Sequence, residues 1–219
     1  PVMSRINLAA LIPSMLSGMG VSLQIFGITL LLGLPLGLLL AAGRMSRLRA
    51  LRYPVQAFLL VMRGTPLMLQ LFFFYFGPFY IFGLRGMNRF AAVLIAFVLN
   101  YAAYFAEIYR GGIESISQGQ YEAAEALGFT KKQTFFRIVL PQVLKRILPS
   151  MGNEFMTLVK DTALARVISV VELFDVAAKA ANSSVSAVPF VVAAVFYLVM
   201  NLVVGQLFQL AERKLDYYR

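Results

Sequence analysis

Residues 121–141 read YEAAEALGFTKKQTFFRIVLP, a polar and charged stretch inside an otherwise strongly apolar chain. The six residues before Gly128 are strong helix formers, and Gly128 is placed to end their helix with a positive φ angle. Thr130 can then cap a second short helix, with Gln133 three residues on as its capping-box partner. Pro141 marks the next boundary. The pattern predicts two short helices joined at a sharp angle.

This predicted pair of helices carries an apolar edge. Its members are Leu127, Phe129, Phe135 and Phe136. Because an exposed apolar patch on a polar segment usually contacts another protein, we expect a partner to dock here.

The composition outside this stretch indicates an integral membrane protein. Of 219 residues, 60% are hydrophobic and 14% charged, and the mean hydropathy is +0.76. A soluble domain is usually nearer to 45–50% apolar and about 25% charged. The excess is too large for one globular core to bury, so lipid must cover much of this surface.

The chain has no Cys and no His. Disulfides are therefore excluded, and so are a thiol nucleophile and an imidazole base. A zinc or iron–sulfur site is not expected. We predict no metal site and no cofactor bound by this chain.

The formal net charge is +10, which in a soluble protein would suggest nucleic acid as a partner. No basic stretch is interleaved with aromatic residues as a strand-binding groove requires. Basic residues also flank membrane spans on the cytoplasmic side. We therefore expect no nucleic-acid binding.

Charge-free runs and charge balance together predict five membrane-spanning helices. A helix of about 20 residues crosses the hydrocarbon core of a bilayer. The predicted spans are about 17–43, 55–80, 88–111, 142–171 and 187–212, with a cytoplasmic loop at about 119–141. The fourth span contains ionisable residues that hydropathy alone would reject, so its polar side must face a water-filled path or another subunit.

The distribution of basic residues orients these spans. With the fourth span included, thirteen basic residues lie on the cytoplasmic side and four lie outside: Arg5, Arg85, Arg89 and Lys179. Without it, the basic C-terminus would face outside, against the positive-inside tendency. The predicted fold is an all-α membrane protein with its N-terminus out and its C-terminus in.

The first predicted span contains Gly33 and Gly37, one helical turn apart, with Pro35 between them. Two small residues at this spacing let another helix approach closely, either within the chain or from a second subunit. Pro35 is expected to bend the helix. Because five helices of this size cannot easily enclose a solute path, we also expect an oligomer.

Glu154 and Asp161 are the first candidates for a substrate site. They are seven residues apart and so share one helix face, about 10.5 Å apart along the axis, with Thr157 between them. Two carboxylates facing an internal path can bind an ammonium group or a cationic side chain. The alternative is that Lys160, Arg166 or a neighbouring helix neutralises them for structural reasons.

The third predicted span supplies a second set of candidates. Asn100, Tyr104 and Glu107 fall on one face, with Tyr101 a further step around the helix. Asn100, Tyr101 and Tyr104 can give hydrogen bonds and an aromatic wall to a solute. Interhelical hydrogen bonding, common for such residues in membranes, is the alternative.

Arg63 lies beside Gly64 and Pro66 in the second predicted span. We expect its guanidinium to reach the cytoplasmic interface and the Gly and Pro to break the helix. Binding of a carboxylate by Arg63 is the alternative.

The opening stretch resembles the EAA loop of ABC importer permeases. The run E-A-A-x3-G-x9-I-x-L-P matches from Glu122 through Gly128 to Pro141. Around it the chain resembles the polar amino acid uptake (His/Glu/Gln/Arg) family, through R-G-T-P at 63–66 and A-E-I-Y-R-G-G-I at 106–113. The sequence K-D-T-A-L at 160–164 is similar to that family's K-D-T-S-L motif, with Ala163 where Ser is usual.

This resemblance, which covers nearly the whole chain, implies a single transmembrane domain over residues 1–219 with the type I importer permease fold. It implies a dimer with a second permease copy or a close homologue, a pair of ATPase subunits and an extracytoplasmic solute-binding protein that delivers an amino acid. The location implied is the plasma or inner membrane of a prokaryote. The EAA loop would be the coupling helix that docks in the ATPase, through Glu122, Ala123, Ala124, Leu127, Gly128 and Phe129.

This chain contains no G-x4-G-K-[ST] phosphate loop. ATP and Mg would therefore be bound by the partner ATPase, and this chain would be no enzyme. The rival interpretation is a secondary carrier or channel that uses Glu154 and Asp161 for ion coupling. Such carriers often show inverted repeats over more helices, and no repeat is visible. An intramembrane enzyme is a third possibility, for which no catalytic motif is present.

Overall fold

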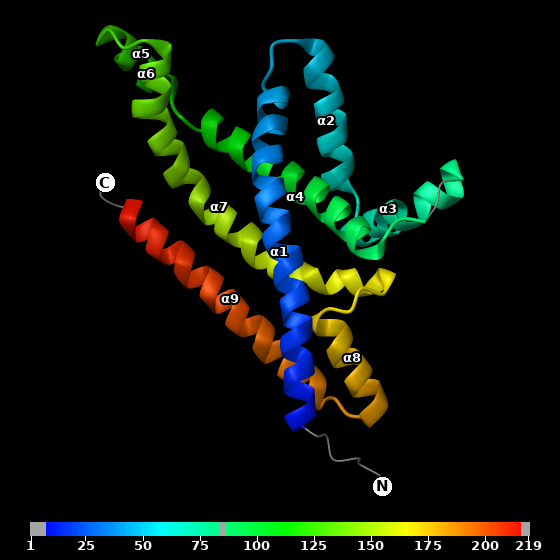
Figure 1. Cartoon of the computed structure of the whole chain (residues 1–219). Coiled ribbons are helices and arrows are strands. Elements are labelled where there is room, and N and C mark those ends of the chain that lie inside the picture. The colour runs from blue at the N-terminus through cyan, green and yellow to red at the C-terminus, as the bar shows by residue number, and fades with distance from the viewer. Residues whose placement is uncertain (1–7, 84–85, 216–219) are drawn as a thin grey trace.

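Helices make up the architecture of the computed structural model, which describes residues 8–83 and 86–215. The described part contains no strand, as the predicted all-α class requires. In chain order the helices are α1 (Leu8–Arg44), α2 (Arg49–Gly64), α3 (Leu67–Phe82), α4 (Arg89–Glu114), α5 (Gln118–Ala126), α6 (Lys131–Thr134), the π-helical turn η1 (Phe135–Val139), α7 (Leu140–Asp161), the 3-10 helix η2 (Thr162–Ile168), α8 (Leu173–Ser184) and α9 (Val188–Leu215) (Figure 1).

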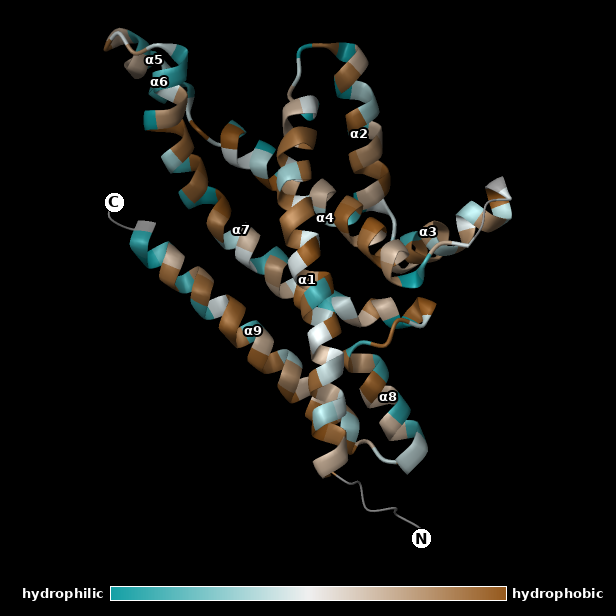
Figure 2. Ribbon diagram, viewed as in Figure 1, coloured by the Kyte–Doolittle hydropathy of each residue, from teal (hydrophilic) through white to brown (hydrophobic). Residues whose placement is uncertain are grey.

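Three helices of the described part, α1, α4 and α9, are long and apolar enough to cross a membrane. Together α2 and α3 add a fourth crossing if the bent pair is one span. Figure 2 shows mainly hydrophobic residues (brown) along α9. Hydrophilic residues (teal) are more frequent at α5, at α6 and at the C-terminal end of α9. Arg5 and Arg85, two of the four basic residues predicted to lie outside, fall beyond the described residues.

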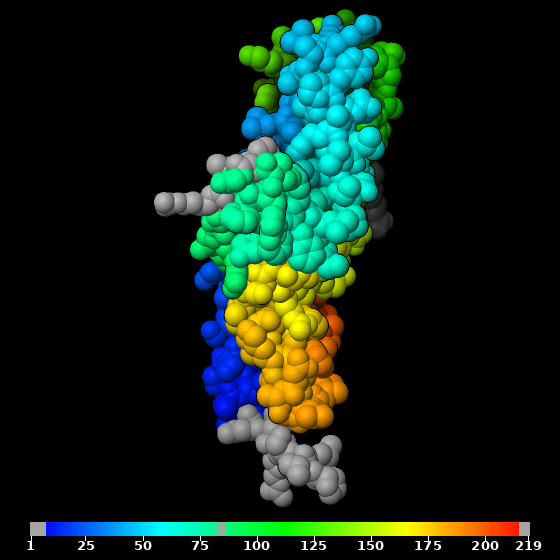
Figure 3. Space-filling view, turned by 90° about the vertical axis from the view of Figure 1, so that its right-hand side faces the viewer, coloured from blue at the N-terminus to red at the C-terminus, as the bar shows by residue number. Residues whose placement is uncertain are grey.

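A sharp break divides the second predicted span. The axes of α2 and α3 meet at 110°, and Thr65 between them is extended at φ −121° and ψ 146°. The residue before a proline is disfavoured in the helical region, so Pro66 forces this conformation. The predicted helix break at Gly64 and Pro66 is confirmed, and α3 runs across the molecule against η2 (Figures 1 and 3).

Both basic connections lie at one end of the molecule. The turn between α1 and α2 and the elements α5 and α6 are at the same end, whereas α8 and the start of α1 lie at the opposite end (Figure 1). From the α8 end, α9 runs toward the end that carries α5 and α6. The segment with the EAA pattern and the turn between α1 and α2 therefore lie at the same end of the molecule.

Close packing of α1 against α4 forms the centre of the fold. A Cβ atom added at Gly37 would lie 2.8 Å from Phe105 Cβ and 3.1 Å from the carbonyl oxygen of Ala102. At Gly33 the nearest atom, Phe105 Cε2, would be 3.5 Å away. The two glycines therefore admit a helix of the same chain, and α1 continues as one helix through Pro35.

We expect Gly37→Val to lower the free energy of unfolding by about 1–3 kcal/mol, the usual cost of overpacking a core. The added methyl groups meet the backbone of α4, which cannot move aside as a side-chain tip can. Thermal unfolding in detergent measures the effect. The control is Gly27→Val on the same helix, where a Cβ atom has no neighbour within 4 Å. Equal unfolding midpoints for the two variants would contradict the α1–α4 packing.

The loop that follows α4 has most of the predicted local features. Gly128 ends α5 at φ +77°, and its N–H donates to the carbonyl oxygen of Glu125. Thr130 and Gln133 form the predicted capping box at the start of α6. A boundary between elements does lie at Leu140–Pro141, but the chain does not break there, because α6 continues through the π-helical turn η1 into α7. Pro141 stands at the start of α7, where its missing N–H is tolerated.

Candidate functional site

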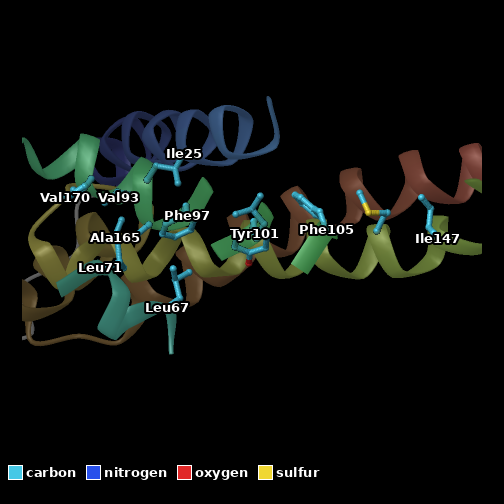
Figure 4. Close-up of a cluster of buried hydrophobic side chains, with 14 of the residues drawn as sticks. Ile25, Leu67, Leu71, Val93, Phe97, Tyr101, Phe105, Ile147, Ala165 and Val170 are labelled. Atoms are coloured by element: carbon cyan, nitrogen blue, oxygen red, sulfur yellow. The ribbon is translucent and has the colours of Figure 1, made fainter. Parts of the chain in front are cut away.

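A hydrogen bond between α4 and α7 lies at the centre of the candidate site. The Tyr101 hydroxyl donates to Oδ2 of Asp161 at 2.8 Å. Tyr101 is fully buried in the main hydrophobic cluster, and Figure 4 shows its hydroxyl directed toward the α7 ribbon. The apolar packing around the ring fixes the phenol, so the bond holds the Asp161 carboxylate at one position on the last turn of α7.

Glu154 is half-buried two turns before Asp161 on α7. Asp161 acts electrostatically on it, as expected for carboxylates on one helix face. Within residues 8–83 and 86–215, Glu154 has no ion pair. Arg166, one of the expected neutralising groups, pairs with Asp175 at 3.6 Å instead.

Thr157, between the two carboxylates, is also half-buried. Its hydroxyl donates to the backbone carbonyl of Asn153 at 2.9 Å, one turn earlier on α7. The Thr157 oxygen can still accept a hydrogen bond from a solute, because a hydroxyl has two lone pairs.

Asn100 lies away from the two carboxylates. Its Nδ2 donates to the Met62 carbonyl and to Gln70 Oε1, both at 3.0 Å. Gln70 in turn donates to Met62 and to Thr65 around the α2–α3 break. The interhelical alternative describes Asn100 better, since its amide satisfies backbone groups that the break leaves free.

Tyr104 and Glu107 lie further along α4 in a cationic cluster. The carboxylate of Glu107 has three arginines around it: Arg110 at 2.7 Å, Arg63 at 3.4 Å and Arg44 at 3.9 Å. Arg63 also covers the Tyr104 ring, with Cζ 5.5 Å from its centroid. The cluster ties α1, α2 and α4 together.

The predicted coupling edge is only partly exposed. Leu127 is 75% exposed and Phe136 is 64% exposed. Phe135 is exposed less strongly and Phe129 is half-buried. Of the EAA residues themselves, Glu122 and Ala123 are exposed, whereas Ala124 is buried. The free surface is therefore formed chiefly by Leu127, Phe136 and the outer side of α5.

Sequence reasoning missed a buried carboxylate at Glu172. This side chain is 0% exposed and caps α8 by accepting from the N–H groups of Phe174 and Asp175, both at 2.7 Å. Tyr197 of α9 donates to it at 3.1 Å, and Ser22 of α1 at 3.5 Å. The available signal was an acidic residue directly before a helix-forming run, which is typical of an N-cap.

Burial raises the pKa of the Glu172 carboxyl above its ordinary value. The backbone N–H groups of Phe174 and Asp175 act in the opposite direction, because they stabilise the ionised form. Glu172 therefore joins α1, α8 and α9 through hydrogen bonds, and η2 with residues 169–171 separates it from Asp161.

Comparison with known proteins gives related sequences over most of the chain. Residues 33–217 match the family model for the inner membrane component of binding-protein-dependent transport systems. An octopine transport system permease protein, OccM of Rhizobium radiobacter, is 37% identical over 207 residues, which cover 91% of this chain and 84% of that protein. The arginine transport system permease protein ArtQ of Bacillus subtilis is 36% identical over 205 residues and 93% of each chain.

Solved structures show the same fold. An amino acid ABC transporter, crystallised with histidines, superposes with a TM-score of 0.88 at 32% identity, over 98% of this chain and all of that one. The methionine transporter MetNI in an inward-facing conformation gives a TM-score of 0.72 at 19% identity, which supports the fold alone. The chain therefore belongs to the family of inner membrane components of binding-protein-dependent transport systems, and it is the membrane-spanning permease subunit of an ATP-driven amino acid importer.

Proposed function

We propose that the imported amino acid passes Asp161 and Tyr101 on its way across the membrane. The observation that carries this proposal is the 2.8 Å hydrogen bond by which a buried phenol orients a carboxylate on a helix too polar to face lipid. An oriented intramembrane carboxylate is costly and is usually functional. Here it suits an ammonium group.

In this proposal Glu154 and Thr157 extend the site along the same face of α7. Glu154 forms no ion pair within the described residues. Its carboxylate can therefore pair with a positively charged group of a solute. Tyr104 supplies an aromatic wall. The substrate class that fits two carboxylates is a zwitterionic or cationic amino acid.

We also propose that five crossings build the domain, with the N-terminus outside and the C-terminus inside. The crossings are α1, the bent pair α2 and α3, α4, α7 with η2, and α9. The polar face of α7 supports the fourth crossing, because a lipid-facing helix would not hold Glu154 and Asp161. A second permease subunit then closes the path, and a solute-binding protein delivers the amino acid at the α8 end.

The coupling role belongs to the segment from Glu122 to Phe129. Its support is the exposed Leu127 beside the Gly128 turn, together with the short helix α5 on which Glu122, Ala123 and Ala124 stand. A cleft in the ATPase would hold this helix, as helix-in-groove contacts do elsewhere. ATP and Mg bind that separate subunit. The rival, a secondary carrier coupled through Glu154 and Asp161, is not favoured by relatives that are ABC and binding-protein-dependent permeases.

The Asp161→Asn variant is expected to lower ATP-driven amino acid uptake at least tenfold, or about 1.4 kcal/mol. The substitution keeps the shape and the Tyr101 bond but removes the charge that attracts ammonium. Uptake into proteoliposomes that contain the whole complex measures this loss, while basal ATP hydrolysis is expected to remain.

The control for Asp161→Asn is Glu212→Gln, which neutralises an exposed carboxylate near the end of α9. It is expected to transport normally. Unchanged uptake by Asp161→Asn would remove Asp161 from the path. Failure of the wild-type complex to import any amino acid would overturn the proposed function itself.

A further inference from the structure

Two arginines around Glu107 make only one ion pair each, Arg44 at 3.9 Å and Arg63 at 3.4 Å, and Arg63 is the more exposed of the two. Arg110 donates to both oxygens of Glu107 and pairs with Glu114 as well. Arg63 makes one ion pair at 3.4 Å, and no hydrogen bond from it is found in the described part of the chain. Its side chain is 41% exposed. A guanidinium has five N–H donors in a fixed fork that suits a carboxylate.

The surroundings of Arg63 leave a surplus of positive charge. Three arginines, 44, 63 and 110, gather around two carboxylates, those of Glu107 and Glu114. Glu107 is satisfied by the two-oxygen contact with Arg110. Arg63 therefore keeps N–H donors that Glu107 does not occupy.

Two tyrosines of α4 connect Arg63 to Asp161 of α7. Arg63 acts electrostatically on Glu154, yet no ion pair joins them in the described residues. A continuous row of contacts leads from Arg63 over the Tyr104 ring to Tyr101, whose ring centroid lies 6.4 Å from that of Tyr104, and so to Asp161. Arg63 and Asp161 thus lie at the two ends of this row, and no ion pair joins them among the described residues.

We propose that Arg63, held by the ring of Tyr104, binds the α-carboxylate of the transported amino acid while Glu154 and Asp161 bind its positive charge. This assignment rests on the proposed function, because it adds a positively charged group to the site proposed around Glu154 and Asp161. The site then recognises a solute with both charges, and neither a simple amine nor a simple acid satisfies both ends.

Direct binding to the purified permease–ATPase complex, without the solute-binding protein, tests the assignment. The probes are L-arginine, L-histidine and L-glutamine, each compared with its α-carboxamide, which lacks the carboxylate charge. The wild-type complex is expected to bind at least one amino acid about tenfold or more tightly than its amide. In Arg63→Gln the amino acid is expected to lose about tenfold in affinity while the amide loses little, so that the discrimination disappears.

The matched control is Arg49→Gln, which removes the same charge from an exposed position at the start of α2. It is expected to keep the wild-type discrimination. Equal losses for amino acid and amide in Arg63→Gln would show a structural role and overturn the assignment. The absence of any discrimination in a wild-type complex that imports amino acids would overturn it as well, whereas absence of import would show that the proposed function has failed.

Discussion

A Gly128→Val permease is expected to insert and fold, yet to lose ATP-driven uptake almost completely. Gly128 has φ +77°, a conformation that costs an ordinary L-residue about 1–2 kcal/mol and a β-branched one more. No atom lies within 4 Å of a Cβ at this position, so the effect is backbone strain and not a clash.

A valine at position 128 would relieve its backbone strain by adopting a negative φ, which changes the direction of the chain after α5. The N–H groups of Gly128 and Phe129 donate to the carbonyls of Glu125 and Ala124, and these bonds fix the turn. A different φ at residue 128 breaks them and redirects the exposed Leu127 relative to α6. We expect the ATPase to dissociate from the permease or to hydrolyse ATP without transport, as measured by co-purification and by uptake.

Two further variants isolate the backbone effect of Gly128→Val. Gly128→Asn is expected to retain most uptake, because asparagine adopts the left-handed region readily. Gly119→Val lies in α5 with open space around it and is expected to behave as wild type. Normal uptake by Gly128→Val would show that this turn does not transmit the ATPase motion.

The features predicted correctly from sequence are those that neighbouring residues determine. Gly128 and the Thr130–Gln133 capping box depend on the backbone within four residues. The break after Arg63 depends on Pro66. Pro141 lies in the first turn of α7, but the π-helical turn that carries the chain from α6 into α7 without a break has no local signal in the sequence.

Features that depend on distant contacts were not predictable to the same degree. Spacing placed Glu154 and Asp161 on one face of a helix, but the bond from Tyr101 depends on how α4 packs against α7. Asn100 precedes Tyr101 by one residue, which rotates it by about 100° around the helix axis. This rotation directs its amide to the α2–α3 break and away from Asp161.

Helix α8 and its buried cap were missed for a related reason. The region 172–187 lies between two predicted spans and has no long apolar run, so no helix is predicted there. The role of Glu172 depends on Ser22 and Tyr197, each at least 25 residues away in sequence, which donate hydrogen bonds to its carboxylate. Local sequence does not reveal these contacts.

Removing this carboxylate by Glu172→Ala is expected to destabilise the permease by about 3–5 kcal/mol. The substitution leaves the N–H groups of Phe174 and Asp175 and the hydroxyl of Tyr197 without their acceptor in a site closed to water. A lower midpoint of thermal unfolding in detergent measures the loss. Tyr197→Phe, which removes one hydrogen bond and keeps the ring, is expected to cost about 1 kcal/mol.

Transport by Glu172→Ala is expected to fall even below the unfolding temperature, because Glu172 anchors one end of the segment whose other end carries Asp161. The 3-10 helix Thr162–Ile168 connects the two, so a loosened α8 allows the last turn of α7 to move away from Tyr101. Glu212→Ala, at an exposed position on α9, should change neither stability nor uptake. If Glu172→Ala lost stability while its uptake at low temperature stayed normal, Glu172 would support the fold alone. A loss of uptake at a temperature where Glu172→Ala stays folded would support a role of Glu172 in orienting Asp161 from beyond the other end of η2.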